Sequence, residues 1–217
     1  MSIMSIAGRK SSWMRRIVAG FAAAALGVAM AGARADDQTP DALVKGISNQ
    51  VLDSIRADKS LQSGDPNKLL QLVDQKVMPS VDFERMTQLA VGRGWRNATP
   101  DQKTELEKQF RVLLVRTYSG AMAQVRDHRV EMKPSRNDPG ATDVVVRSQI
   151  VSSGSDPIQL DYRLEKKPEG WKIYDVNVLG VWLIENYRSQ FRQQIDSGGV
   201  DGLIKSLQDR NAQNAKS

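Results

Sequence analysis

The sequence predicts an α+β fold with a four-stranded antiparallel sheet and about six or seven helices. Residues 158–165 alternate strictly between apolar and polar side chains, which is the period of a strand with one apolar face. A second strand follows the turn around Pro168 and Gly170. Beyond Gly180 the apolar residues recur at steps of three and four, which indicates a helix with an apolar stripe. A sheet and a helix therefore both turn an apolar side toward a shared interior.

The first 35 residues have the pattern of a secretory signal peptide. Arginine and lysine residues precede an apolar run of 14 residues from Ile17 to Met30, and Ala33-Arg34-Ala35 forms a small-residue cleavage site. A transmembrane helix needs roughly 20 apolar residues, so this run is too short to be one. We expect cleavage after Ala35, a single domain over residues 36–210, and a frayed polar tail over residues 211–217.

Removal of the signal peptide would change the charge balance of the chain. Five of the 31 basic residues and none of the 25 acidic residues lie in residues 1–35, which leaves 26 basic and 25 acidic residues. The basic stripe that a nucleic-acid-binding protein needs is therefore not indicated. The sequence contains no cysteine, which excludes disulfides and lipid attachment at a cysteine.

Helix-start signals recur through the first half of the chain. In three places a capping side chain precedes proline at the first helical position, and the strongest signal is Thr99-Pro100-Asp101-Gln102, which also predicts a capping box. We predict a helix from Pro40, a second from about Pro66 that stops before Pro79, a short third helix over Val81–Val91, and a long fourth helix from Pro100 to about Val125.

Four strands are predicted in the second half, joined by short turns as in an antiparallel meander. They are Arg129–Lys133, Thr142–Ser152, Ile158–Lys166 and Trp171–Val178. The fourth strand changes parity partway along, which predicts a bulge near Ile173 or Tyr174. The helix after Gly180 is expected to stop at Gly198 and Gly199, before a last short helix around residues 203–207.

The sequence offers little catalytic chemistry. Its one histidine is His128. The sequence contains neither a G-x-S-x-G nucleophile pattern nor a phosphate-binding glycine loop. Zinc is not expected, because cysteine is absent. Asp175 is a candidate general base if it points inward, although a structural carboxylate at the bulge is the simpler interpretation. The apolar-sided sheet and the two long amphipathic helices suggest either an ordinary core or a shell around an apolar ligand. A small enzyme that uses Asp175 or His128 and a protein-binding adaptor are the alternatives.

Six ordered segments of the sequence resemble the MlaC family. The first contains Gly94-Trp95-Arg96 and the run Ala98-Thr99-Pro100-Asp101-Gln102, and the last reads Gly-Val-Asp-Gly-Leu. The segments are Val91–Gln102, Phe110–Tyr118, Gly170–Val176, Gly180–Val181, Tyr187–Phe191 and Gly199–Leu203. The resemblance covers nearly all of the chain from about Pro40 to Arg210. Each segment alone is weak, but the ordered set of segments is specific.

This resemblance implies a periplasmic phospholipid carrier rather than an enzyme. Such carriers shuttle lipid between an outer-membrane lipoprotein complex and an inner-membrane ABC transporter with its substrate-binding ring, which maintains the lipid asymmetry of the outer membrane. The implied fold is a curved sheet wrapped by helices, with acyl chains in an apolar cavity between them and the headgroup near solvent. We therefore expect phospholipid as cargo, no cofactor or metal, no nucleic-acid partner, and a monomer.

The acyl chains are expected to contact the inward apolar side chains of the helices and the sheet. The expected lipid-binding residues are Phe83, Met86, Leu89, Phe110, Leu113, Leu114, Tyr118, Met122, Val144, Val146, Leu160, Tyr162, Leu164, Val176, Val178, Val181 and Ile184. One position departs from the family, which often has a small hydroxyl residue where this chain has Trp182. If Trp182 points inward, the pocket should be shallower or shaped for different tails.

Overall fold

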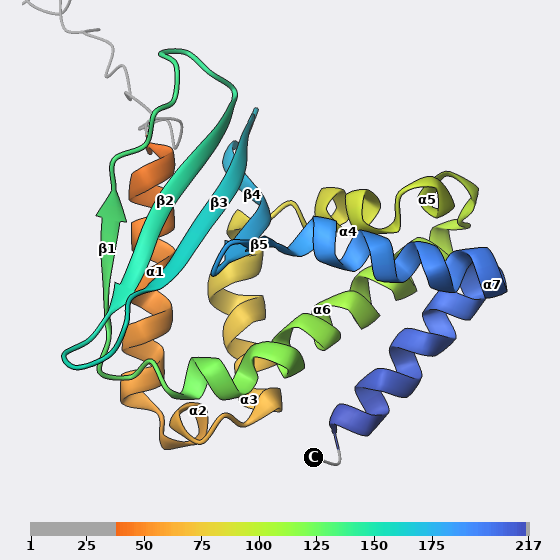
Figure 1. Cartoon of the computed structure of the whole chain (residues 1–217), viewed down its shortest axis with the longest axis horizontal. Helices are drawn as coiled ribbons and strands as arrows, with labels where there is room; N and C mark the ends of the chain where they lie inside the picture. Colours follow the sequence, from red (N-terminus) through yellow and green to blue (C-terminus); the bar gives the residue numbers. More distant parts are fainter. Residues whose placement is uncertain (1–37, 216–217) are drawn as a thin grey trace, which may run out of the picture. The chain divides into compact units, whose positions relative to one another are not determined.

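The computed structural model describes residues 38–215, in which helices come first, the sheet follows and one long helix ends the chain (Figure 1). The α-helices are α1 (Pro40–Ala57), α2 (Lys59–Gln62), α3 (Pro66–Leu72), α4 (Phe83–Val91), α5 (Arg93–Asn97), α6 (Pro100–Ala123) and α7 (Leu183–Asn214). A π-helical turn, η2 (Val73–Val77), and a 3-10 turn, η3 (Met78–Ser80), lie between α3 and α4. The strands are β1 (Arg129–Lys133), β2 (Asp143–Val151), β3 (Ile158–Lys167), β4 (Gly170–Val178) and β5 (Val181–Trp182). The signal peptide predicted for residues 1–35 lies outside the described residues.

Each strand pairs antiparallel with its neighbour in sequence, in the order β1-β2-β3-β4-β5. The α+β class and the predicted meander are therefore confirmed, with β5 as a fifth strand. Because β5 has two residues, it is too short to show an alternating pattern. A register shift opposite Arg163 and Leu164 leaves Tyr174 as the extra residue of β4, which confirms the predicted bulge.

The predicted helix starts are confirmed by their caps. Thr99 Oγ1 accepts a hydrogen bond from the amide of Gln102 at 3.2 Å, and Gln102 Oε1 accepts one from the amide of Thr99 at 2.9 Å. These two bonds form the predicted capping box, and they satisfy amides that have no partner inside the helix. Thr39 and Asp65 cap α1 and α3 in the same way, each followed by proline.

The chain between α3 and α6 differs from the prediction in detail. The second predicted helix widens into η2 and then tightens into η3, because Pro79 has no amide hydrogen and cannot continue an α-helix. The third helix begins at Phe83 rather than Val81, capped by Asp82, whose carboxylate accepts from the amide of Arg85 at 2.9 Å. The third helix is expected to break at Gly92 and Gly94. The structure breaks it at Gly92, which has φ 63°, and Gly94 lies inside the short helix α5 that follows.

Helix α7 consists of two helical segments that meet at Gly199. This residue has the non-helical values φ 66° and ψ −164°, which confirms the predicted stop, and the last helix that follows it is longer than predicted and extends to Asn214 (Figure 1). The tail predicted from residue 211 is helical as far as residue 214. Asn211 is 5% exposed, and its side-chain amide donates to the backbone carbonyl of Gln109 on α6 at 2.9 Å. A polar run gives no sequence signal for such a partner.

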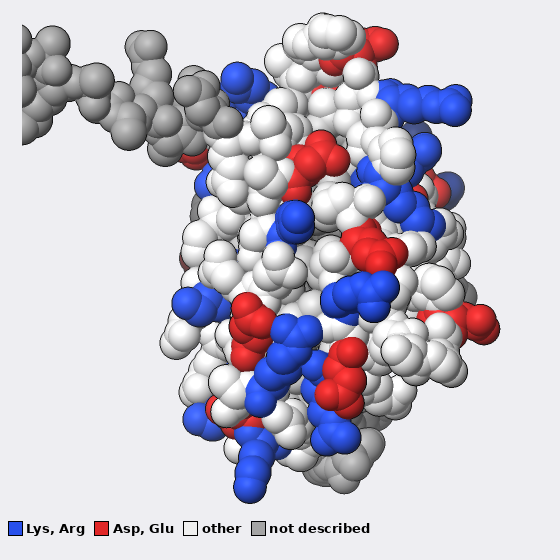
Figure 2. All heavy atoms as spheres, turned by 90° about the vertical axis from the view of Figure 1, so that its left-hand side faces the viewer, with Lys and Arg blue, Asp and Glu red and all other residues white. Residues whose placement is uncertain are grey.

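The outer surface is charged in both signs. On the side that Figure 2 shows, basic and acidic side chains are interspersed rather than gathered by sign. None of the helices between residues 38 and 215 is both long enough and apolar enough to cross a membrane.

Candidate functional site

One face of the sheet consists of side chains that the strand pairing brings into rows. Cross-strand partners in a sheet point to the same side, so the register shows which side chains are neighbours. The rows are Val144–Leu164–Ile173, Val146–Tyr162–Val176, Met132–Ser148–Leu160–Val178–Val181 and Val130–Ile150–Ile158. None of the residues in these rows is charged. We call this surface the apolar face.

The apolar face is closed at one end and partly open at the other. The side chains of the first row are at most 5% exposed, and α1 packs on them through Val44 and Ile47. All three side chains of the last row are only partly buried, and the third row ends at Val181, which is 51% exposed. We call the partly buried side chains of β1 to β4 on this face, other than Met132, the open half. They are Val130, Ile150, Ile158, Leu160, Tyr162, Val176 and Val178.

The open half lies where separate parts of the core meet. Within residues 38–215 the buried apolar side chains form three clusters, and Val176 packs against two of them. Helix α6 adds three partly buried side chains. Leu114 and Tyr118 pack against the cluster whose residues come mainly from α4 to α7. Met122 packs against the cluster that includes residues of α1, α2 and α3. Side chains that face inward but remain partly accessible leave apolar surface for an additional apolar group to cover.

The predicted lipid-binding residues divide into three groups. Those packed into closed core are Phe83, Met86, Phe110, Leu113, Val144, Val146, Leu164 and Ile184. Those that are partly buried are Leu89, Leu114, Tyr118, Met122, Leu160, Tyr162, Val176 and Val178. Val181 is exposed. The second group therefore contains the side chains that a ligand could reach.

Four further partly buried side chains border the same region and were not among the predicted residues. They are Val51 on α1, Val130, Ile150 and Ile158. Ile150 and Ile158 have the same parity as the predicted residues on their strands, so alternation alone contains the signal for them. For Val51 the helical period indicates only that the side chain faces inward. It does not show that the residue borders the open half, because Val51 packs against two clusters.

The centre of the apolar face contains two hydroxyl groups, those of Tyr162 and Ser148. Burial raises the pKa of the Tyr162 hydroxyl, and hydrogen bonds with Ser48 of α1 and Ser148 of β2 offset part of that rise. Ser148 Oγ also donates to the backbone carbonyl of Leu160 at 3.1 Å. These hydroxyls connect α1 to the sheet, and they are neutral, so they offer hydrogen bonds to a ligand but no charge.

The apolar face and the helices that pack over it form the walls of the predicted apolar cavity. The walls are in contact at the closed end and incompletely packed at the open half. Two surface hollows lie along α7, the smaller of about 150 Å³, and their lining includes Gln194, Ser206 and Arg210 but no residue of the sheet.

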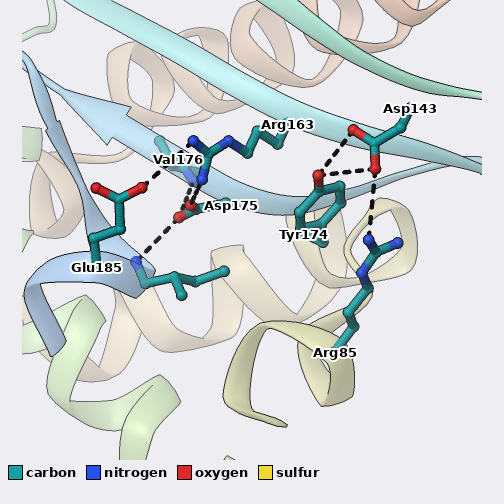
Figure 3. A network of polar contacts seen from close by, with 8 residues as sticks. Arg85, Asp143, Arg163, Tyr174, Asp175, Val176 and Glu185 are labelled. Atoms are coloured by element: carbon teal, nitrogen blue, oxygen red, sulfur yellow. Dashed lines mark hydrogen bonds and ion pairs between the residues drawn. The ribbon is translucent and has the colours of Figure 1, made fainter. Parts of the chain in front are cut away.

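The opposite face of the sheet carries a polar network around Asp175 (Figure 3). Asp175 is fully buried, and its Oδ1 accepts hydrogen bonds from the amides of Val176 at 2.9 Å and Ile184 at 3.1 Å. Its Oδ2 accepts from Arg163 Nη1 at 3.1 Å, and Arg163 also lies 3.5 Å from Glu185. Because Ile184 lies in the first turn of α7, Asp175 supplies the cap that Trp182, at the N-cap position, does not provide.

The neighbouring contacts extend this network to α4. The guanidinium of Arg85 lies 3.9 Å from the centre of the Tyr174 ring, and it pairs with Asp143 at 3.5 Å and with Glu165. The Tyr174 hydroxyl donates to the Asp143 carboxylate at 2.9 Å. Burial and this hydrogen bond raise the pKa of Tyr174 to about 12. The network joins β2, β3 and β4 to the helices on the face away from the apolar rows.

Neither Asp175 nor Trp182 lies on the apolar face. Trp182 pairs with Asn177, on the same side of the sheet as Asp161 and Arg163, and the guanidinium of Arg163 stacks 3.9 Å above its ring. Trp182 therefore does not make the site shallower. Burial raises the pKa of Asp175, but both of its oxygens are already occupied by hydrogen bonds, which supports the structural interpretation rather than a catalytic base.

His128 has the surroundings of a structural residue. It lies between α6 and β1, where its amide donates to the carbonyl of Val125 at 3.1 Å and its own carbonyl accepts from Arg56. Its Nδ1 has no hydrogen-bond partner among the described residues, whereas a catalytic imidazole is oriented by such a partner.

We expect alkaline titration to report on these packed aromatic side chains. The pKa of Tyr118, Tyr162, Tyr174 and Tyr187 is raised above 10, chiefly by burial. In the unfolded chain these hydroxyls ionise near pH 10, so the folded protein holds more protons above that pH and its stability falls as pH rises. The tyrosinate absorbance should therefore stay flat through pH 10 and rise together with unfolding. Ionisation of most tyrosines near pH 10 with unchanged circular dichroism would contradict this packing.

These features define an α+β domain in which helices cover one uncharged, incompletely packed face of an antiparallel sheet. A family model described as MlaC protein matches residues 45–209, which is 165 of the 217 residues. The chain therefore belongs to the MlaC family, as its ordered segments predicted.

Two characterised relatives and one solved structure show how similar other members are. The toluene tolerance protein ttg2D of Pseudomonas putida is 24% identical over 165 residues, which are 76% of each chain. The intermembrane phospholipid transport system binding protein MlaC of Haemophilus influenzae is 23% identical over 175 residues, 79% of this chain and 82% of the relative. A phospholipid-binding protein from Ralstonia solanacearum, solved in complex with a phospholipid, is 49% identical with a TM-score of 0.78, and the match covers 83% of this chain and 99% of that one.

Proposed function

We propose that this protein is a carrier that binds the acyl chains of a phospholipid at the open half of the apolar face. The observation that carries the proposal is the gradient of burial across that face, from a closed row under α1 to partly accessible side chains opposite α6. The relatives support it, since one is named for phospholipid transport and another was solved with a phospholipid bound. In this proposal the bound phospholipid is cargo, and no cofactor is expected.

The physical chemistry of lipids explains why a covered apolar surface suffices. A buried methylene contributes roughly 0.8 kcal/mol, so exposing a tail of about 16 carbons to water costs on the order of 12 kcal/mol. An unassisted lipid therefore crosses water too slowly to be useful. A carrier has to cover the tails and can leave the headgroup in solvent, which fits rows that contain hydroxyls but no charged side chain.

The proposed location is the periplasm, reached through the signal peptide predicted over residues 1–35. There the protein would carry lipid between an outer-membrane lipoprotein complex and an inner-membrane ABC transporter with its substrate-binding ring, and so maintain lipid asymmetry. The sequence has no phosphate-binding glycine loop, so the energy for directed transport would come from the partner transporter. We expect the protein itself to act as a monomer and to catalyse no reaction.

The decisive experiment is a lipid extraction. We expect protein purified from cells without detergent to release phospholipid into an organic solvent, in a constant molar ratio that mass spectrometry of the extract can measure. A periplasmic protein of similar size, expressed and purified in parallel, controls for lipid carried over from membranes. If the folded protein releases no more phospholipid than this control, and also takes up none from vesicles, the carrier proposal is wrong.

A further inference from the structure

The hairpin between β4 and β5 has an unusual residue at its tip. Val178 and Val181 pair across the turn, and the two residues between them, Leu179 and Gly180, have φ values of 51° and 91°. Positive φ at both central residues is the requirement of a type I′ turn, which asparagine, aspartate and glycine satisfy best. Among residues 38–215, Leu179 is the one residue other than glycine with positive φ. A leucine at this position is strained because of its Cβ atom.

This strained turn is held firmly in place. The amide of Leu179 donates to the carbonyl of Gln159 on β3 at 3.1 Å. The amide of Gly180 donates to Oδ1 of Asn177 at 2.8 Å, and Asn177 is itself buried. The backbone is therefore fixed, and it holds the Leu179 side chain in solvent at 64% exposure. Strain kept at a surface position without a packing benefit indicates a function for the exposed side chain.

The tip continues the apolar face to the surface. In the third row, Leu160 and Val178 are partly buried, and Val181 at the end of the row is 51% exposed. Within the described residues, Leu179 and Val181 are the large apolar side chains that are exposed. The face on which we propose that acyl chains lie therefore reaches water at this hairpin.

We propose that the β4–β5 hairpin is the lip over which an acyl chain of the phospholipid enters and leaves the protein, with Leu179 and Val181 in contact with the chain during passage. This inference rests on the proposed function. A hydrocarbon chain is the occupant that fits, because the tip is continuous with the uncharged rows. A lip of this kind covers a few methylenes of the tail while it is between membrane and protein, so it accelerates exchange without being required for resting binding.

The test compares exchange rate with resting binding. Leu179→Asn keeps a residue that tolerates positive φ and removes the apolar side chain, so it should fold at least as well as the wild type. We expect the rate at which the protein moves pyrene-labelled phosphatidylethanolamine between protein-free vesicles of phosphatidylethanolamine and phosphatidylglycerol to fall about tenfold, which corresponds to about 1.4 kcal/mol of barrier. The amount of lipid bound at equilibrium should not change. Leu179→Met, which keeps an apolar tip, should restore most of the rate.

Ser153→Asn in the exposed turn between β2 and β3 provides the matched control, and its rate should equal that of the wild type. An unchanged rate for Leu179→Asn would overturn the lip and leave the tip as a contact for a protein partner. An equal loss of bound lipid and rate would also overturn it, because Leu179 would then belong to the resting site. If the wild type binds no phospholipid, both the proposed function and the lip are wrong. If the wild type binds and transfers phospholipid and Leu179→Asn transfers it equally fast, only the lip is wrong.

Discussion

Replacing Asp175 with alanine should lower the free energy of unfolding by about 3 kcal/mol, the low end of the range for breaking a buried ion pair. The variant leaves the buried amide of Ile184 without an acceptor, and it removes the closer of the two carboxylates that pair with Arg163. The low end applies because the Arg163 side chain is 31% exposed and can be partly hydrated. For a protein of this size the melting temperature should fall by about 6–12 °C, measured by circular dichroism or calorimetry.

Two further variants separate the causes of this loss. Asp175→Asn keeps an oxygen for the two amides and removes the charge, so we expect a loss of about 1–2 kcal/mol. Glu185→Gln removes the other carboxylate near Arg163. The Glu185 side chain is 66% exposed, so this variant should lower the free energy of unfolding by less than about 0.5 kcal/mol. If Asp175→Ala cost no more than Glu185→Gln, the carboxylate would not be the cap that fixes the start of α7.

The role of Asp175 shows where sequence reasoning succeeded and where it ended. The change of parity in β4 was enough to predict the bulge at Tyr174, because side-chain alternation has a strict period of two. The cap on α7 could not be predicted, since the carboxylate and the amide of Ile184 are brought together by a hairpin whose second strand is two residues long. A pattern that depends on local spacing contains no information about such a contact.

The same limit applies to the candidate site. Alternation placed Val146, Tyr162 and Val176 on one face, and their pairing in the sheet confirms this. It could not show that Val146 is fully buried while its two partners in the row are partly accessible, because that difference depends on how α1 covers one end of the face. The apolar residues that line a ligand and those that fill a core have the same sequence pattern, and packing alone separates them.

Replacing Leu114 with aspartate should abolish lipid loading while the protein stays folded. Leu114 is partly buried on α6, against the same cluster as Val176 and Val178 of the open half. An acyl chain seated there would have to desolvate the new carboxylate, which costs several kcal/mol. Since each 1.4 kcal/mol changes a dissociation constant tenfold, affinity for phospholipid should fall by at least about 100-fold. The loss of stability should stay near 1–2 kcal/mol, because the side chain is not fully enclosed.

Two comparisons determine whether Leu114 contacts the cargo. Thr104→Asp places the same charge at an exposed position on α6 and should retain wild-type lipid in the extract. Val146→Asp places it where the side chain is 0% exposed, in the closed part of the core, and should unfold the protein. A Leu114→Asp protein that melts like Val146→Asp would make Leu114 ordinary core. One that keeps both its stability and its lipid would show that the tails do not reach α6, and the site would then have to lie elsewhere on the apolar face.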